Sequence, residues 1–149
     1  MKRILYIEDE ESDAFILKYA FQQIGVEDPL DVITDGVQAI RYLSGEGNYA
    51  DRERFPIPCL ILLDLNLPRK SGFEVLEWRR AHSVARLIPV VIFTSSQNAA
   101  DIRQAYELGA AGYLTKVPDP ADCCDRACAI RDFWLDHNIP PSPCTRSVL

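Results

Sequence analysis

The sequence predicts an α/β fold, in which helices cover both faces of one parallel sheet. Five short segments rich in Ile, Val and Leu alternate along the chain with segments whose apolar residues recur at helical spacing. Three of the short segments are apolar on both faces, as is typical of the central strands of a covered parallel sheet. Regular strand–helix alternation indicates successive βα units, which form parallel sheets.

The expected strands cover residues 3–8, 30–34, 59–63, 88–93 and 112–115. Right-handed crossovers between parallel strands leave few topologies for five such units. We therefore expect a flavodoxin-like (βα)5 fold, a doubly wound parallel sheet with strand order 2-1-3-4-5.

Helical patterns fill the intervals between the strands. Ser12 or Asp13 is the expected N-terminal cap of the first helix, and Gly25 is its expected end. The second helix covers about residues 37–43, and the third begins near Gly72.

The two remaining helices lie in the C-terminal half of the chain. The fourth is expected to end at Gly109, and the last to run on to about His137. We expect one domain over residues 1–137, because a length of 149 residues suits a single core. Residues 138–149 are interrupted by prolines and predict an irregular tail. Before the third strand, the polar insertion 45–58 is long enough to suggest a functional or mobile loop.

Charge and composition exclude several classes of protein. The net charge is −6, and no dense Lys/Arg cluster is present to neutralise nucleic-acid phosphates. No apolar run is long enough to span a bilayer, and the N-terminus lacks the pattern of a signal peptide. The five cysteines are an odd number, three of them bunched in one segment, so we expect thiols rather than a disulfide framework. We expect a cytoplasmic protein with neither nucleic acid nor membrane as partner.

The residues at the carboxyl ends of the strands carry the expected chemistry. In an open α/β sheet, ligands bind beyond these ends. Polar residues stand there on strands 1, 3, 4 and 5, which are neighbours in the expected order: Glu8, Asp9, Asp64, Thr94 and Lys116. We therefore expect them to converge on one small patch.

Three clustered carboxylates, those of Glu8, Asp9 and Asp64, repel one another unless they bind a cation. An all-oxygen site suits Mg²⁺, and the carbonyl of Asn66 offers another ligand. Lys116 suits a tetrahedral anion as a compact point charge, and Thr94 adds a hydroxyl donor. These groups together fit phosphoryl transfer to a carboxylate nucleophile.

Four motifs, ILYIEDE, DLNLPRKSG, FTSS and GAAGYLTK, occur in this order at the expected strand ends. With them, residues 1–130 resemble the receiver domains of response regulators. The resemblance implies roles for seven residues: Asp64 as phosphoacceptor, Glu8 and Asp9 as the acidic pair, Asp9, Asp64 and the Asn66 carbonyl as Mg²⁺ ligands, Thr94 as switch hydroxyl, Tyr113 as switch aromatic, and Lys116 as the phosphate-contacting lysine.

The chain departs from the receiver pattern after Lys116, where Val117 replaces the usual proline. Because a cis bond before a non-proline residue costs about 3 kcal/mol, we expect a different path for the following loop. The insertion 45–58 and the Phe-Trp-containing last helix make the chain similar to a narrower group. This group comprises the single-domain regulators paired with bacterial and cyanobacterial phytochrome histidine kinases.

The resemblance implies a single-domain response regulator that accepts a phosphoryl group from a histidine kinase and signals through protein contacts. Its chemistry would be limited to assisting its own phosphorylation and slow dephosphorylation. One alternative is a haloacid-dehalogenase-like, Mg²⁺-dependent phosphatase, although that family needs a second Asp where Asn66 stands. Another is a receiver-like scaffold that works without phosphate.

The end of the last helix predicts a homodimer. Phe133, Trp134 and Leu135 follow one another, and a helix spreads adjacent residues by about 100°, so at least one faces outward. Ile139 and the proline-rich tail follow, and an extended arm beside an exposed aromatic suits docking on a second copy. The alternative is a tail that folds back over its own helix.

Overall fold

The computed structural model describes residues 2–141, and within them five parallel strands form one sheet. Its strand order is β2-β1-β3-β4-β5, so the predicted flavodoxin-like topology is confirmed. The strands are short and lie within or close to their predicted ranges: β1 Ile4–Ile7, β2 Leu30–Ile33, β3 Leu60–Leu63, β4 Val90–Thr94 and β5 Gly112–Thr115.

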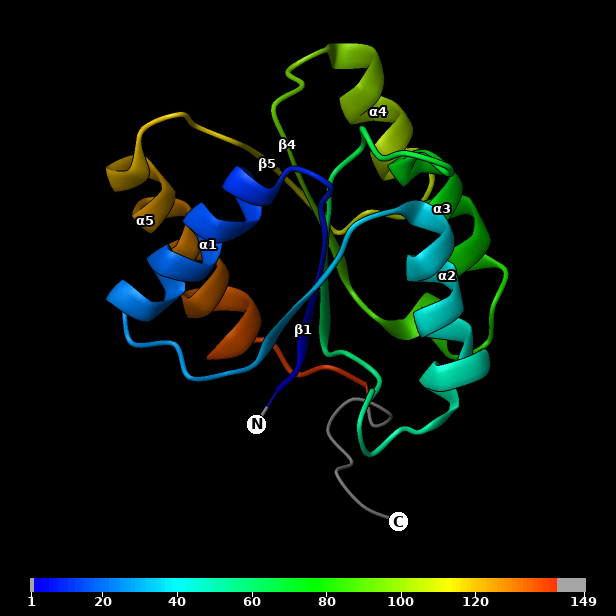
Figure 1. Ribbon diagram of the computed structural model, residues 1–149. Helices are drawn as coiled ribbons and strands as arrows, with labels where there is room; N and C mark the ends of the chain where they lie inside the picture. The colour runs from blue at the N-terminus through cyan, green and yellow to red at the C-terminus, as the bar shows by residue number, and fades with distance from the viewer. Residues whose placement is uncertain (1, 142–149) are drawn as a thin grey trace.

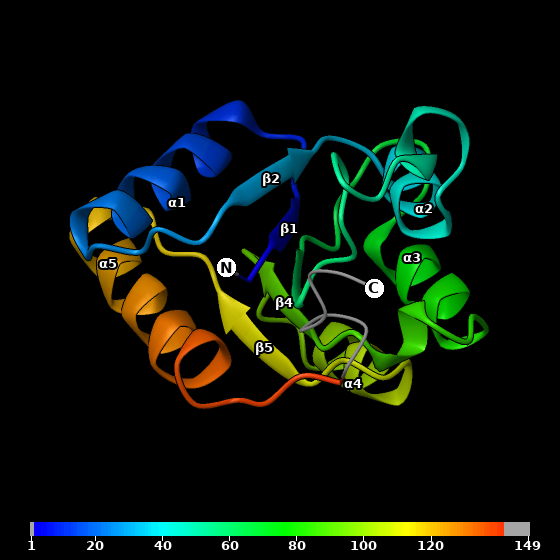
Figure 2. The same cartoon turned by 90° about the horizontal axis from the view of Figure 1, so that it is seen from below.

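The fold has three layers, because five α-helices cover the two faces of the sheet (Figures 1 and 2). Helices α1 and α5 lie on one face, and α2, α3 and α4 lie on the other. Their bounds are α1 Glu11–Gln23, α2 Gly36–Ser44, α3 Gly72–Arg80, α4 Ala99–Glu107 and α5 Pro120–Ala129. Three short helical turns complete the described chain: η1 Gly47–Ala50, η2 Ala85–Leu87 and the π-helical η3 Ile130–Leu135.

The core consists of two apolar clusters, one on each face of the sheet. Leu5 and Ile7 of β1 belong to the cluster under α2, α3 and α4, whereas Tyr6 faces the cluster under α1 and α5. All residues of β1, β3 and β4 are buried. The central strands are therefore apolar on both faces, as their sequences indicated.

The start of α1 differs from the expected cap. Neither Ser12 nor Asp13 caps this helix, because it begins earlier, at Glu11, and follows Glu10, whose side chain makes no capping hydrogen bond. Asp13 instead lies in the first turn, with its carboxylate bonded to Lys116. The helix ends near Gly25, which has a φ of 80°.

The insertion 45–58 is packed onto α2. Arg52 donates hydrogen bonds to the carbonyl oxygens of Tyr42 (2.8 Å), Leu43 (3.0 Å) and Phe55 (3.2 Å). The rings of Tyr42, Tyr49 and Phe55 form one cluster with centroids 5.0–5.9 Å apart. The segment is thus an ordered extension of α2 that satisfies its last carbonyl groups.

The end of the last helix exposes one aromatic side chain and buries its neighbours. Leu135 is buried and Trp134 packs against the core, while Phe133 is 53% exposed and Ile139 is 89% exposed. This confirms that at least one of the three large apolar side chains faces outward. The predicted tail, 138–149, is irregular as far as residue 141, and the rest of it lies outside the described residues.

Within the described residues, no helix has the length and apolar character needed to cross a membrane. Cys123, Cys124 and Cys128 are free thiols, as expected. Cys59 is disulfide-bonded, so the expectation of thiols throughout is wrong at this position.

Candidate functional site

The register of the sheet brings the predicted residues to one edge. Ile7 of β1 pairs with Leu63 of β3, so Glu8 and Asp64 emerge side by side. The Asp64 amide donates to the Ile7 carbonyl at 3.1 Å, and the Lys116 amide donates to that of Thr94 at 2.8 Å. The strand ends that were expected to converge therefore do so.

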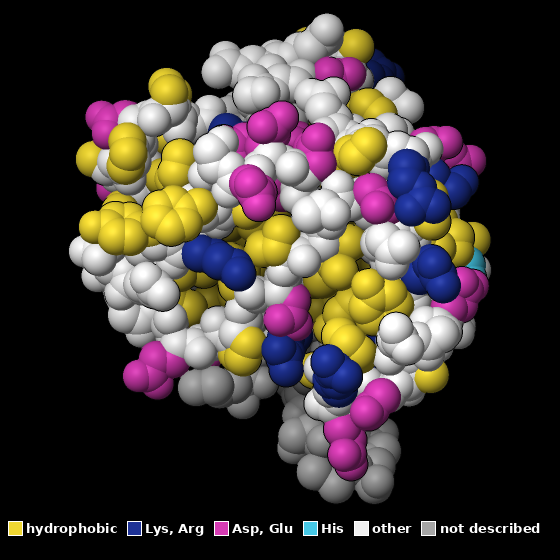
Figure 3. All heavy atoms as spheres, viewed as in Figure 1, with side chains coloured by type: hydrophobic (Ala, Val, Ile, Leu, Met, Phe, Trp, Pro, Cys, Tyr) yellow, Lys and Arg dark blue, Asp and Glu magenta, His cyan; other side chains and the backbone are white. Residues whose placement is uncertain are grey.

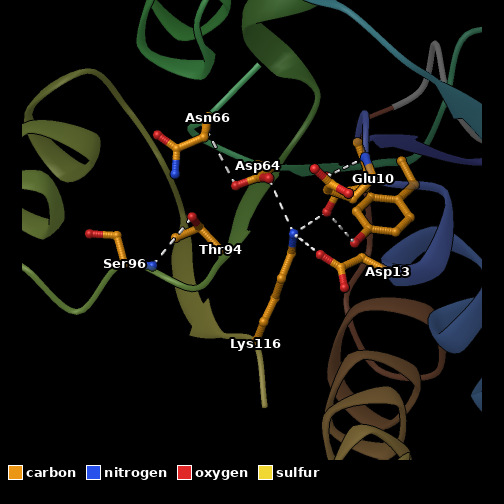
Figure 4. A network of polar contacts seen from close by, with 9 residues as sticks. Glu10, Asp13, Asp64, Asn66, Thr94, Ser96 and Lys116 are labelled. Carbon is orange, nitrogen blue, oxygen red and sulfur yellow. Dashed lines mark hydrogen bonds and ion pairs between the residues drawn. The ribbon is translucent and has the colours of Figure 1, made fainter. Parts of the chain in front are cut away.

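Lys116 is the centre of the site (Figure 4). Its ammonium donates hydrogen bonds to Glu8, to Asp13 Oδ2 at 2.9 Å and to Asp64 Oδ2 at 3.1 Å. Its side chain is largely buried. Burial lowers the Lys116 pKa, but the carboxylates outweigh this effect and raise it, so the ammonium stays charged.

Glu8 is the most enclosed of these carboxylates. Its Oε1 accepts from Lys116 and from the Tyr6 hydroxyl (3.1 Å), and its Oε2 accepts from the Glu10 amide at 3.2 Å. Burial raises the pKa of Glu8 to about 7, an effect opposed by Lys116 and reinforced by the Asp64 charge.

Glu8, Asp9 and Asp64 form a group that suits a divalent cation. One carboxylate oxygen from each lies within 4.8 Å of the others, and Asp9 is exposed at the rim. Acidic side chains gather on this part of the surface, above the carboxyl ends of the strands (Figure 3). A donor set made only of carboxylate oxygens fits a hard cation such as Mg²⁺ or Mn²⁺.

The loop between β3 and α3 encloses Asp64 tightly. A Cβ atom at Gly72 would lie 2.4 Å from the Asp64 carbonyl oxygen, so only glycine fits there. Ser71 and Glu74 form a capping box that starts α3 directly after this contact. The Asn66 amide lies 3.4 Å from Asp64 Oδ1, which places Asn66 at the rim of the site.

Thr94 and Tyr113 lie on the β4–β5 side. Thr94 is buried at the end of β4, and its Oγ1 is 3.5 Å from the Ser96 amide. The Tyr113 hydroxyl donates to the Ser96 carbonyl at 2.9 Å, so the loop after β4 is tied to β5. The peptide bond between Lys116 and Val117 is trans.

Two residues near Lys116, Asp13 and Tyr6, were not predicted from the sequence to lie at the site. Asp13 was considered only as a helix cap, although its position four residues after Asp9, in the first turn of a helix, directs it back toward the strand end. Tyr6 lies two residues before Glu8, so strand alternation directs both side chains to the same face of the sheet. Helical spacing for Asp13 and strand alternation for Tyr6 were the sequence signals that could have placed these residues at the site.

The response regulator receiver domain model matches residues 4–127. The chain belongs to this family. It is 37% identical over 141 residues to the response regulator Rcp1 of a Synechocystis strain, a match that covers 95% of this chain and 94% of Rcp1.

Solved structures of receivers show the same fold. The phosphorylated cyanobacterial phytochrome response regulator RcpA has a TM-score of 0.87 to this receiver at 35% identity, covering 94% of this chain and 98% of RcpA. The Mn²⁺-bound form of Rcp1 has a TM-score of 0.85 to this receiver at 36% identity, and the match covers 95% of this chain and 99% of Rcp1.

These findings confirm both resemblances read from the sequence, to receivers in general and to the phytochrome-associated group. They give no support to the phosphatase alternative. The protein is a response regulator receiver, and its relatives are response regulators rather than classical enzymes.

Proposed function

We propose that this receiver accepts a phosphoryl group on Asp64, with Mg²⁺ held by Asp9, Asp64 and the Asn66 carbonyl beside Glu8. The observation that carries the proposal is the 3.1 Å hydrogen bond from Lys116 to Asp64 Oδ2, next to a carboxylate group suited to a cation. A fixed cation on one side and a metal site on the other are what a transferring phosphoryl group requires.

The reaction follows from this arrangement. An Asp64 oxygen attacks phosphorus, the bond from phosphorus to the donor breaks, and the donor leaves with the bonding electron pair. Bound Mg²⁺ would neutralise charge on the phosphoryl oxygens. Lys116 would bind a phosphoryl oxygen, and Thr94 would donate its hydroxyl to another. Slow attack of water on the acyl phosphate would return Asp64 and release inorganic phosphate.

The phosphoryl donor would be a sensor histidine kinase in the cytoplasm, and a phytochrome kinase is the best candidate. Support comes from the relatives, since RcpA is named as a cyanobacterial phytochrome response regulator and a neighbour from R. palustris functions in red light signaling. The receiver would act through protein contacts made by residues 1–137. The exposed Phe133 and Ile139 support a homodimer formed through the C-terminal helix and the tail 138–149.

The test is intact mass after incubation with acetyl phosphate and Mg²⁺. We expect one phosphoryl adduct in the wild type, none after Asp64→Asn, and none when EDTA removes the cation. Asp64→Asn keeps the shape of the side chain, so the fold is retained. A phosphoryl adduct on any residue of the Asp64→Asn variant, or an unmodified wild type, would contradict the assignment; the latter would favour a phosphate-independent scaffold.

A further inference from the structure

Lys116 uses all of its donors in this structure. An ammonium group has three N–H donors, and each has a carboxylate acceptor: Glu8, Asp13 and Asp64. Glu8 and Asp64 belong to the group of carboxylates suited to a cation, but Asp13 does not. Asp13 is thus the one carboxylate partner of Lys116, among the described residues, that a bound cation would not share.

Asp13 also reaches Lys116 from a different element. It lies in the first turn of α1, whereas the other two acceptors lie at the ends of β1 and β3. Its side chain is 37% exposed, against 0% for Glu8 and 6% for Asp64. The helix N-terminus favours a negative charge at this position.

We propose that Asp13 is a positioning residue that holds Lys116 beside Asp64 while the acidic group binds a divalent cation. This inference deepens the proposed function and rests on it, because it concerns the lysine that would bind the phosphoryl group carried by Asp64. When a cation binds, Glu8 and Asp64 share their oxygens with it, and the cation repels the ammonium. Asp13 then keeps the ammonium in place and leaves two donors free for phosphoryl oxygens.

Without Asp13, the metal-bound site holds Lys116 poorly. A lysine side chain is flexible and loses considerable conformational entropy when it is fixed. An ammonium displaced toward solvent has to be repositioned before it stabilises the transferring group. The proposal therefore predicts a kinetic effect in the presence of Mg²⁺ and a structural effect on Lys116 itself.

Asp13→Ala tests the kinetic effect, with Glu11→Ala as the matched control. Glu11 lies in the same first turn of α1 and carries the same charge, but it is not one of the three carboxylates that accept hydrogen bonds from Lys116. At saturating acetyl phosphate and Mg²⁺, we expect Asp13→Ala to slow phosphorylation about tenfold, the effect of losing one charge-assisted hydrogen bond. Glu11→Ala should stay within about twofold of the wild type. Asp13→Asn, which keeps an acceptor oxygen, should lie between them.

The ¹⁵N signal of the Lys116 ammonium gives a readout independent of phosphorylation. Without metal, we expect a protected signal in all variants, because Glu8 and Asp64 still bind the ammonium. With Mg²⁺, the signal should persist in the wild type and in Glu11→Ala and be lost by fast exchange in Asp13→Ala. If Asp13→Ala matches Glu11→Ala in rate and signal, the positioning role is refuted. A wild type that takes up no phosphoryl group refutes the proposed function, while the Lys116 signal still decides the role of Asp13.

Discussion

At the residue scale, the space around Asp64 is set by a neighbouring glycine. Gly72 begins α3, and its amide donates to the Leu65 carbonyl at 3.0 Å. The Cα hydrogen of Gly72 faces the carbonyl oxygen of Asp64, where no methyl group fits. The backbone position of Asp64, the proposed phosphoacceptor, therefore depends on a residue eight positions later in the chain.

Gly72→Ala is expected to displace Asp64. The added Cβ would lie 2.4 Å from the Asp64 carbonyl oxygen, so the loop has to move. We expect a loss of about 2 kcal/mol in the free energy of unfolding, as for other overpacking changes, together with slower phosphorylation by acetyl phosphate. Gly112→Ala is the control, because its Cβ would meet only ordinary contacts at 3.7 Å or more. Urea denaturation and intact mass measure the two effects, and equal results for both variants would contradict this account.

At the scale of elements, the half-buried guanidinium of Arg52 connects the insertion to α2. Burial lowers the pKa of Arg52, whose guanidinium is surrounded by carbonyl groups of α2 and of the insertion itself. An arginine fork satisfies several helix-terminal carbonyls at once, which water would otherwise have to do. Arg52 therefore helps to order the insertion, beside the ring cluster of Tyr42, Tyr49 and Phe55.

Arg52→Ala should loosen the insertion. We expect a loss of about 2 kcal/mol in the free energy of unfolding and faster amide exchange across residues 45–58, because three carbonyl groups lose their donor. Arg54→Ala removes the same charge from the same segment, but that guanidinium lies only over the Phe55 ring at 5.3 Å. The control should cost less than about 1 kcal/mol. Unchanged exchange after Arg52→Ala would show that the aromatic cluster holds the segment by itself.

Hydrogen bonds connect the end of β4 to β5 and to α4 at the surface. The Tyr113 hydroxyl binds the Ser96 carbonyl, and Ser96 Oγ donates to Asp101 of α4 at 2.7 Å. A movement of Thr94 toward a phosphoryl oxygen would pull on this loop and disturb both hydrogen bonds. These hydrogen bonds would transmit a movement of Thr94 to Tyr113 and to α4.

Phosphorylation should therefore change the NMR chemical shifts of Tyr113 and of Tyr106 on α4. Tyr113→Phe removes the hydroxyl and should weaken the effect on Tyr106 while leaving Asp64 able to accept the phosphoryl group. The same spectra of Asp64→Asn with acetyl phosphate control for binding of the reagent. Shifts confined to the neighbours of Asp64 would argue against coupling through this loop.

At the scale of the whole molecule, the dimer hypothesis concerns the exposed apolar residues after α5. Phe133 and Ile139 present the most exposed apolar surface of this end of the described chain. Truncation before them is unsuitable as a test, because it would also remove Leu135 and Trp134, which pack in the core.

Phe133→Ser combined with Ile139→Ser should shift a dimer toward the monomer in light scattering over the micromolar range, because both side chains would lose an apolar contact. Phe15→Ser is the control, since Phe15 is 69% exposed on α1 and lies outside the proposed interface. A wild type that stays monomeric throughout this range would rule out the dimer and favour a tail that folds back.

The strand order and the place of the candidate phosphoacceptor, Asp64, were predictable from the amino-acid sequence. Both depend on local signals, namely hydrophobic periodicity and the polar residue that ends each strand. Once β1, β3, β4 and β5 are parallel neighbours, Glu8, Asp64, Thr94 and Lys116 have to meet, whatever the details of packing. The resemblance of the four motifs to receiver domains then indicated phosphoryl transfer as the chemistry of this site.

The pairing of side chains that are distant in the sequence could not be predicted and depends on how the helices pack. Asp13 binds Lys116 rather than a helix backbone, Arg52 orders a segment expected to be a loop, and Phe133 rather than Trp134 is the exposed aromatic. Each outcome depends on the rotation of a helix about its axis and on its distance from the neighbouring element. Periodicity predicts which residues share a face, but the partner that the face meets is set by the packing of the whole domain.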